Sequence, residues 1–359
     1  MEKRIFGYDF VRAMAILLVM VGHSLGFIYS GSYSFFISFL CGFLGVELFF
    51  VLSGVLIGKL LFKVFESKNL EQSLKSFIIR RWLRTLPLYF IMLIVYFFGN
   101  YFFDSVQNKG VSFWKYLFFI QNFYEVQPTF FGISWSLSVE EWFYVLFPFS
   151  LFLIKKSFPN IQTKNLFISA VLIFVIYFLL MRILNLDEGK FHFYEGVRKV
   201  AFFRLDAIAF GIFSVWLMEF FKEKVFKLKN LLFISGLILL ALNQYFIFKD
   251  HYSHLKYFNS VYFSVLGIGL ALMFPFFRNL NWKKSVVTKT IVFISKISYS
   301  LYLVHWLVFR GLELKMFSAF PPQFKFILFF ILSFCTAAFL YYMIEKPVMK
   351  WRNRNFSTS

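Results

Sequence analysis

The chain has 359 residues, 60% of them hydrophobic and 59 of them phenylalanine, and its mean hydropathy is +0.70. These values exclude an ordinary water-soluble domain and predict an integral membrane protein that crosses the bilayer several times. The formal net charge of +20 does not indicate a nucleic-acid partner, because the basic residues lie between hydrophobic segments and not along one soluble face.

Ten hydrophobic segments are long enough to cross about 30 Å of hydrocarbon as helices. In chain order they are residues 8–29, 39–62, 86–103, 134–154, 165–184, 203–221, 230–248, 258–277, 289–309 and 325–344. A further stretch, 113–125, is too short and too polar to count. We therefore expect an all-α membrane protein, a bundle of about ten transmembrane helices, with residues 1–359 forming a single integral-membrane domain and no fused soluble domain.

The distribution of basic residues predicts the orientation of this bundle. With a cytoplasmic N-terminus, 23 Lys and Arg fall in inside segments and 10 in outside ones, and five lie within or at the edges of helices. Cytoplasmic loops carry the excess of Lys and Arg in membrane proteins, so we expect both termini in the cytoplasm. The inside segments include a loop at 63–85, which contains RRWLR, and a tail at 345–354. No small-residue cleavage site follows the first segment, which predicts a retained helix and not a signal peptide.

The first segment contains two ionisable residues, Arg12 and His23. They are eleven positions apart, which on an α-helix leaves them within about 20° of the same direction and about 16 Å apart along the axis. Ionisable groups inside a bilayer are rare and usually face a bundle interior or a wet cavity. Both side chains are therefore expected to face one groove, with Arg12 near the cytoplasmic end and His23 in the outer third.

Other ionisable residues fall at the depth of His23 on other segments. They are Glu47 in GFLGVELFF, Glu140 and Glu141 in WSLSVEEWF, and His305 in SYSLYLVHW. We expect two histidines and up to three carboxylates to converge there. The alternative for each is a structural hydrogen bond to a neighbouring helix. Cys41 and Cys335 each lie in an apolar run and are expected to pack in the core, so no metal site is predicted.

Over nearly its whole length the chain resembles the acyltransferase-3 family of integral-membrane O-acyltransferases. The resemblance is carried, in this order, by RAMAILLVMVGH, GVELFFVLSGVLI, RRWLRTLPLY, WSLSVEEWFYVLFP, RLDAIAFG, ISYSLYLVH and EKP. It implies a ten-helix enzyme of the bacterial cytoplasmic membrane that moves an acyl group, expected to be acetyl, from cytoplasmic acyl-CoA to a carbohydrate hydroxyl. A surface polysaccharide or a lipid-linked glycan would be such an acceptor. Some members continue into an extracytoplasmic hydrolase-like domain, whereas this chain resembles the stand-alone kind.

Acyl transfer to a hydroxyl requires a base that takes its proton, and His23 is the candidate, since an imidazole has an unperturbed pKa near 6.5. Glu140 or Glu47 can orient its ring, and His305 is a further catalytic candidate. A covalent acyl-enzyme on Ser24, Ser53 or Ser136 stays open. None of these serines has a distinctive nucleophile context, so direct transfer is favoured.

The acyl donor is a substrate and not a bound cofactor, and its phosphates are groups that guanidinium side chains bind bidentately. Four arginines are the candidates for donor binding: Arg12, Arg80, Arg81 and Arg84. The alternative for RRWLR is that its arginines only set the topology.

Two other classes of function fit parts of the sequence. A proton-coupled transporter or flippase also places His, Glu and Arg in helices beside a central cavity, but it predicts inverted repeats, and no such halves are evident. A scaffold for envelope assembly would need no base and would tolerate the loss of His23.

Overall fold

The computed structural model describes residues 4–28, 32–103, 112–126, 130–185, 196–249 and 260–356. Within these ranges the regular structure is helical and contains no strand. Ten helical runs in them are long and apolar enough to cross a membrane. The expected all-α membrane bundle of about ten helices is thereby confirmed.

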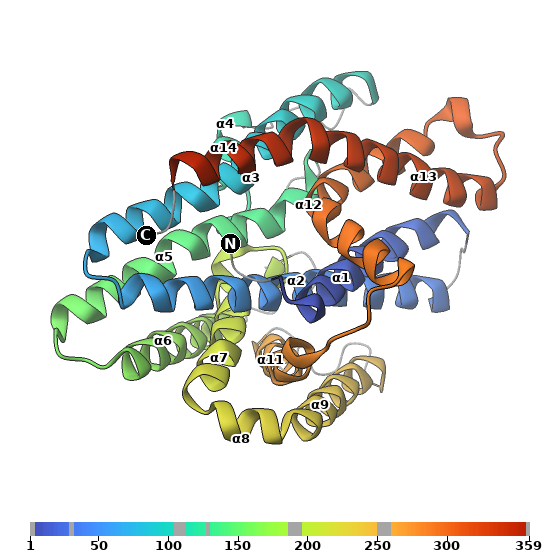
Figure 1. Ribbon diagram of the computed structural model, residues 1–359. Helices are drawn as coiled ribbons and strands as arrows, with labels where there is room; N and C mark the ends of the chain where they lie inside the picture. The colour runs from blue at the N-terminus through green and yellow to red at the C-terminus, as the bar shows by residue number, and fades with distance from the viewer. Residues whose placement is uncertain are drawn as a thin grey trace.

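Each of the ten predicted segments overlaps one long helix, and Figure 1 shows how these helices are arranged. They are α1 (Phe6–Ser24), α2 (Ser32–Phe65), α3 (Leu70–Phe103), α5 (Trp135–Ser157), α6 (Thr163–Leu184), α7 (Asp206–Phe220), α9 (Lys229–Lys249), α11 (Tyr262–Asn279), α12 (Val286–Leu312) and α13 (Pro322–Leu340). The short helices are α4 (Phe113–Leu117), α8 (Lys222–Lys227) and α14 (Lys346–Asn355). The excluded stretch at 113–125 thus contains one short helix.

Two segments that the sequence assigned to a loop and a tail are helical. RRWLR lies inside α3, which begins 16 residues before the predicted segment at 86. The tail at 345–354 continues α13 through a short π-helix, Tyr341–Glu345, into α14. Both boundaries were placed where charge replaces hydrophobicity, which marks the end of the apolar stretch but not the end of the helix.

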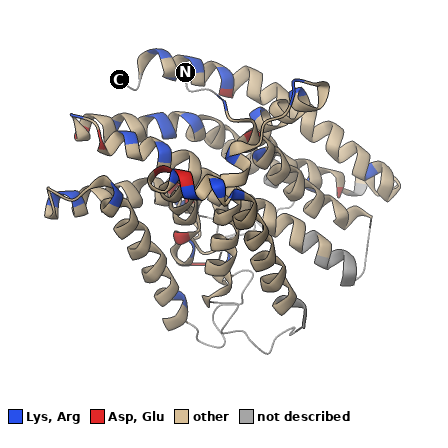
Figure 2. Cartoon of the chain, turned by 60° about the horizontal axis from the view of Figure 1, so that its bottom comes forward, with Lys and Arg blue, Asp and Glu red and all other residues tan. Residues whose placement is uncertain are grey.

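Both chain ends lie at the top of the molecule in the view of Figure 2. We call this side of the bundle the terminal end. Figure 2 shows many Lys and Arg along the helices near this end, and few beside the grey loops at the bottom of the view. The cytoplasmic location of the terminal end stays a prediction.

Helix α2 is the central element of the bundle, because it packs against α1, α3, α5, α7 and α11. It crosses α7 at two glycines, Gly54 and Gly211, where the backbones nearly touch. A Cβ on Gly54 would lie 2.0 Å from the carbonyl oxygen of Ile208, and one on Gly211 would lie 2.0 Å from that of Val51. The small residues of GVLIG therefore allow the close approach that such motifs provide between membrane helices.

Two buried ion pairs connect the beginning of α7 to α6 and to α2. Arg182 of α6 donates to both carboxylate oxygens of Asp206 on α7, at 2.9 and 2.7 Å, and to the Ser264 hydroxyl on α11. Arg204, just before α7, donates to Glu47 of α2 at 2.7 Å. All four charged side chains are at most 3% exposed. Because an unpaired charge in this environment is costly, these pairs are parts of the framework.

Candidate functional site

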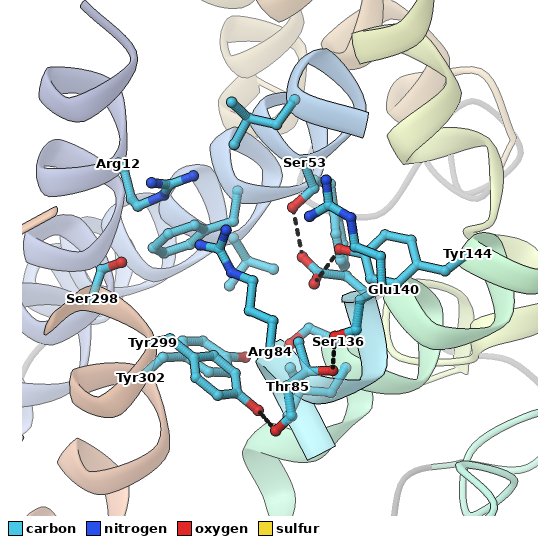
Figure 3. Close-up of a pocket in the computed structure, with 16 residues that line it drawn as sticks. Arg12, Ser53, Arg84, Thr85, Ser136, Glu140, Tyr144, Ser298, Tyr299 and Tyr302 are labelled. Carbon is cyan, nitrogen blue, oxygen red and sulfur yellow. Dashed lines mark hydrogen bonds between the residues drawn. The ribbon is translucent and has the colours of Figure 1, made fainter. Parts of the chain in front are cut away.

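One cavity opens between five helices and encloses about 740 Å³ that no atom fills, including the open space at its mouth. The walls come from α1, α2, α3, α5 and α12 (Figure 3). The lining residues of α2, α3, α5 and α12 recur at helical spacing, so one face of each of these helices lines the cavity, and α1 contributes Arg12. The lining residues are Arg12, Val46, Phe49, Phe50, Ser53, Leu56, Arg81, Arg84, Thr85, Ser136, Leu137, Glu140, Tyr144, Ser298, Tyr299 and Tyr302.

Three of the four predicted donor-binding arginines line this cavity. Arg12 projects into it from α1, and Arg84 extends from α3 toward its centre (Figure 3). Arg81 lies one turn before Arg84, with its guanidinium 5.8 Å from the ring centroids of both Phe77 and Tyr144. In the part of the chain that the structure describes, none of the three pairs with a carboxylate within 4.0 Å.

Glu140 is the carboxylate of the cavity wall. It accepts hydrogen bonds from the hydroxyls of Ser53 and Tyr144, each at 2.9 Å (Figure 3). With three guanidiniums against one carboxylate, the lining keeps a formal excess of two positive charges. Such a cavity attracts a polyanion. The neighbouring Glu141 is also buried but lies outside the lining and accepts a hydrogen bond from Thr85 at 2.7 Å.

The two candidate histidines lie against each other beyond one wall of the cavity. The ring centroids of His23 and His305 are 5.1 Å apart, and His23 also lies 5.1 Å from the ring of Trp306. The ring of Tyr302, which lines the cavity, is 5.7 Å from that of His305. The structure thus connects the cavity to His23 through two aromatic contacts, although neither histidine is in the lining.

Backbone carbonyls orient both imidazoles. The Nδ1 atom of His23 lies 3.0 Å from the carbonyl oxygen of Val19, and that of His305 lies 3.1 Å from the carbonyl oxygen of Leu301. Since a carbonyl oxygen only accepts, we assign the proton of each neutral ring to Nδ1, which leaves Nε2 with its lone pair. The expected carboxylate partner is absent from the contacts of His23 that the structure describes, and a carbonyl one helical turn back serves instead.

The remaining candidates lie elsewhere. Glu47 pairs with Arg204, so its carboxylate is engaged in the framework and not with His23. Arg80 is turned away from the cavity and donates to the carbonyl oxygen of Phe356 beyond α14. Residues that the sequence analysis did not select include Tyr144, Tyr299 and Tyr302 of the lining. Their only signal was a helical spacing, of Tyr144 from Glu140, of Tyr302 from His305 and of Tyr299 from Tyr302, which is hard to notice among 19 tyrosines.

A hydroxyl contact closes the cavity on the side of the histidines. The Tyr302 hydroxyl lies 2.6 Å from the Ser136 hydroxyl and donates to the carbonyl oxygen of Ile133 at 3.0 Å. Tyr302 therefore joins α12 to the beginning of α5 at the place where the cavity ends. Basic groups thus line the cavity, and the two imidazoles lie behind one of its walls. Such an arrangement can bind an anionic donor in the cavity and activate a hydroxyl beside the imidazoles.

Comparison with known sequences identifies the family of the chain. A family model described as an acyltransferase domain matches residues 5–344, nearly the whole chain. The chain belongs to this acyltransferase family. The resemblance seen in its motifs is thereby confirmed, and the matched region contains the cavity and both histidines.

Two named relatives are O-acetyltransferases. The chain is 25% identical to the peptidoglycan O-acetyltransferase OatA of Listeria monocytogenes over 366 residues, 97% of this chain and 56% of the relative. It is 27% identical to the O-acetyltransferase OatA of Staphylococcus aureus over 364 residues, 96% of this chain and 57% of the relative. The chain thus spans little more than half the length of these relatives. No solved structure matches it significantly.

Proposed function

We propose that the protein is a membrane O-acyltransferase that moves an acyl group, acetyl in the simplest case, from cytoplasmic acyl-CoA to a carbohydrate hydroxyl. The observation that carries the proposal is the connection from the arginine-lined cavity through Tyr302 and His305 to His23. The O-acetyltransferase names of the relatives support the choice of acetyl and of an oxygen acceptor.

In this proposal the arginines of the cavity bind the acyl donor. A CoA pyrophosphate near Arg81, Arg84 and Arg12 would neutralise the excess positive charge of the lining. Guanidinium groups bind phosphate oxygens with two parallel hydrogen bonds, which fixes orientation as well as position. From there the pantetheine arm would extend along the apolar wall formed by residues of α2, among them Phe49 and Phe50.

His23 acts in the proposed reaction as the general base. Its Nε2 takes the proton from the acceptor hydroxyl as that oxygen attacks the thioester carbonyl, and the tetrahedral intermediate then releases the CoA thiolate. The thiolate takes the proton from the imidazolium, which restores the neutral ring. His305 packs against His23 and holds the plane of its ring. Such a base contributes on the order of 10² to 10⁴ in rate.

Tyr302 and His305 lie between the cavity and His23 in this structure, so the reaction requires the Tyr302 side chain to turn away from Ser136. The opening would join the donor cavity to the space beside His23. We place the donor on the cytoplasmic side at the terminal end, and the acceptor glycan on the opposite side of a bacterial cytoplasmic membrane.

The direct test uses the purified protein in lipid nanodiscs with ¹³C-acetyl-CoA and a panel of oligosaccharides, muropeptides included. We expect CoA release together with a product that is heavier by one labelled acetyl group on an oxygen, detected by mass spectrometry. Glycans from cells with and without the gene should differ by the same mass. Movement of an unmodified substrate across proteoliposomes, with no acetylated product, would support a transporter and refute the proposal.

A further inference from the structure

Three helical runs, α2, α3 and Pro322–Asn355, are longer than is needed to cross the hydrocarbon, and the last two contact each other. Helix α3 and the run Pro322–Asn355 each have 34 residues, which correspond to about 51 Å against about 30 Å of hydrocarbon. The beginning of α3 contacts α14, the last part of the second run, and the two lie alongside each other in Figure 1. Together they form a contact between two long helices, the α3–α14 contact.

Two arginines meet where these helices touch. Arg80 of α3 donates to the carbonyl oxygen of Phe356 and, at 3.5 Å, to the side-chain oxygen of Asn353. Arg352 of α14 donates to the same Asn353 oxygen at 3.0 and 3.2 Å and to the backbone carbonyl of Arg80 at 3.2 Å. The neutral amide oxygen of Asn353 thus accepts hydrogen bonds from two guanidinium groups.

Within the described ranges, no carboxylate lies within salt-bridge distance of this pair. Helix α14 contains Lys346, Lys350, Arg352 and Arg354 but no acidic residue, and neither Arg80 nor Arg352 pairs with a carboxylate within 4.0 Å among the described residues. The positive charges of Arg80, Arg84 and Arg81 all repel that of Arg352. Gathering like charges in this way is unfavourable unless an anion joins them.

The arginine pair adjoins the proposed donor cavity. Arg80 and Arg81 are consecutive on α3, and a step of about 100° per residue turns one toward α14 and the other toward the cavity. In CoA the pyrophosphate follows the pantetheine arm, and the 3′-phosphate lies farther out on the ribose. A donor with its pyrophosphate at Arg81 and Arg84 would therefore direct its 3′-phosphate out of the cavity.

We propose that Arg80 and Arg352 form a separate phosphate site that binds the 3′-phosphate of the acyl-CoA donor, an inference that rests on the proposed function. The C-terminal helix α14 thereby becomes part of the donor site. The same phosphate chemistry is present in acidic lipid headgroups, and the experiment has to separate the two sources. A purely structural role, in which the arginines only attach α14 to α3, is the other outcome.

The test measures the affinity of the purified protein for CoA and for 3′-dephospho-CoA, in nanodiscs of neutral phosphatidylcholine. The variant is Arg352→Gln, which keeps a hydrogen-bonding side chain but loses the charge. The control is Arg354→Gln, on the exposed side of the same helix. Since a charge-assisted hydrogen bond to a phosphate is lost, Arg352→Gln should weaken CoA binding about tenfold or more and leave dephospho-CoA binding unchanged. Arg354→Gln should change neither.

Equal losses for CoA and dephospho-CoA, accompanied by a lower unfolding temperature, would overturn the inference in favour of the structural role. An effect of Arg352→Gln that appears only in nanodiscs containing phosphatidylglycerol would overturn it in favour of a lipid headgroup. If the wild-type protein binds CoA and Arg352→Gln binds it equally well, this inference alone fails. If the wild-type protein binds neither nucleotide, the proposed function fails with it.

Discussion

The imidazole rings of His23 and His305, from α1 and α12, lie with their centroids 5.1 Å apart, and each ring is anchored through Nδ1 to a carbonyl of its own helix. His305 is fully buried, whereas His23 is only partly buried. Of the two, we therefore propose His23 as the imidazole that an acceptor reaches and His305 as the residue that supports its ring. This division of roles leads to the first prediction.

Replacing His305 with Gln should reduce turnover by less than replacing His23 does, because Gln can still contact the His23 ring but packs it less firmly. The expected change is in kcat, with the KM for the acyl donor unchanged, since the arginines of the cavity remain in place. Steady-state kinetics on the two variants checks this. A loss at His305 as large as that at His23 would mean that His305 itself takes part in proton transfer.

Arg81→Ala should raise the KM for the acyl donor more than it lowers kcat, because the guanidinium is proposed to bind donor phosphates in both the ground state and the transition state. Lys75→Ala is the matched control, since Lys75 is an exposed cation on the same helix. Donor titrations of both variants give the two constants. A fall in kcat alone would indicate that Arg81 shapes the cavity instead of binding the donor.

Glu47→Gln should destabilise the protein by about 3–5 kcal/mol, because it leaves the charge of Arg204 buried without its partner. Thermal unfolding in detergent measures the effect, and Glu66→Gln, at an exposed position just after α2, serves as the control. The folded fraction should keep its kcat, since Glu47 pairs with Arg204 and not with His23. Normal stability with lost turnover would restore Glu47 as a catalytic residue.

Gly54→Ala should destabilise the crossing of α2 and α7 by about 1–3 kcal/mol or more, because the new Cβ would lie 2.0 Å from the carbonyl oxygen of Ile208. Gly42→Ala on the same helix is the control, since a Cβ there meets nothing within 4 Å. The unfolding temperature of Gly54→Ala should fall, and that of Gly42→Ala should not. Equal unfolding temperatures would show that the two helices can separate at this point without cost.

Hydrophobic segments predicted the ten long helices, because the bilayer requires long apolar runs wherever the chain crosses it. The same reasoning missed where α3 begins and where the last helical run ends. Arginines at these ends lie in a cavity or against another helix, so the helix continues although the apolar run does not.

Helical spacing was enough to predict which site residues of one helix share a face. It could not predict contacts between side chains from distant segments of the chain. Arg12 lines the cavity, and His23 lies beyond its wall on the same helix, as their common face suggested. The pairing of Glu47 with Arg204 joins residues 157 positions apart, and no spacing rule links them. The structure likewise supplied Tyr302, which connects the cavity to the histidines.

The role of His23 as the general base is the central claim, and one measurement tests that role directly. Acetyl transfer from ¹³C-acetyl-CoA should be compared for the wild-type protein, His23→Gln and Ser24→Ala, together with their affinities for CoA. We expect His23→Gln to lose a factor of at least about 10² in turnover while binding CoA normally, and Ser24→Ala to retain its activity. Turnover by His23→Gln at the wild-type rate would contradict the account.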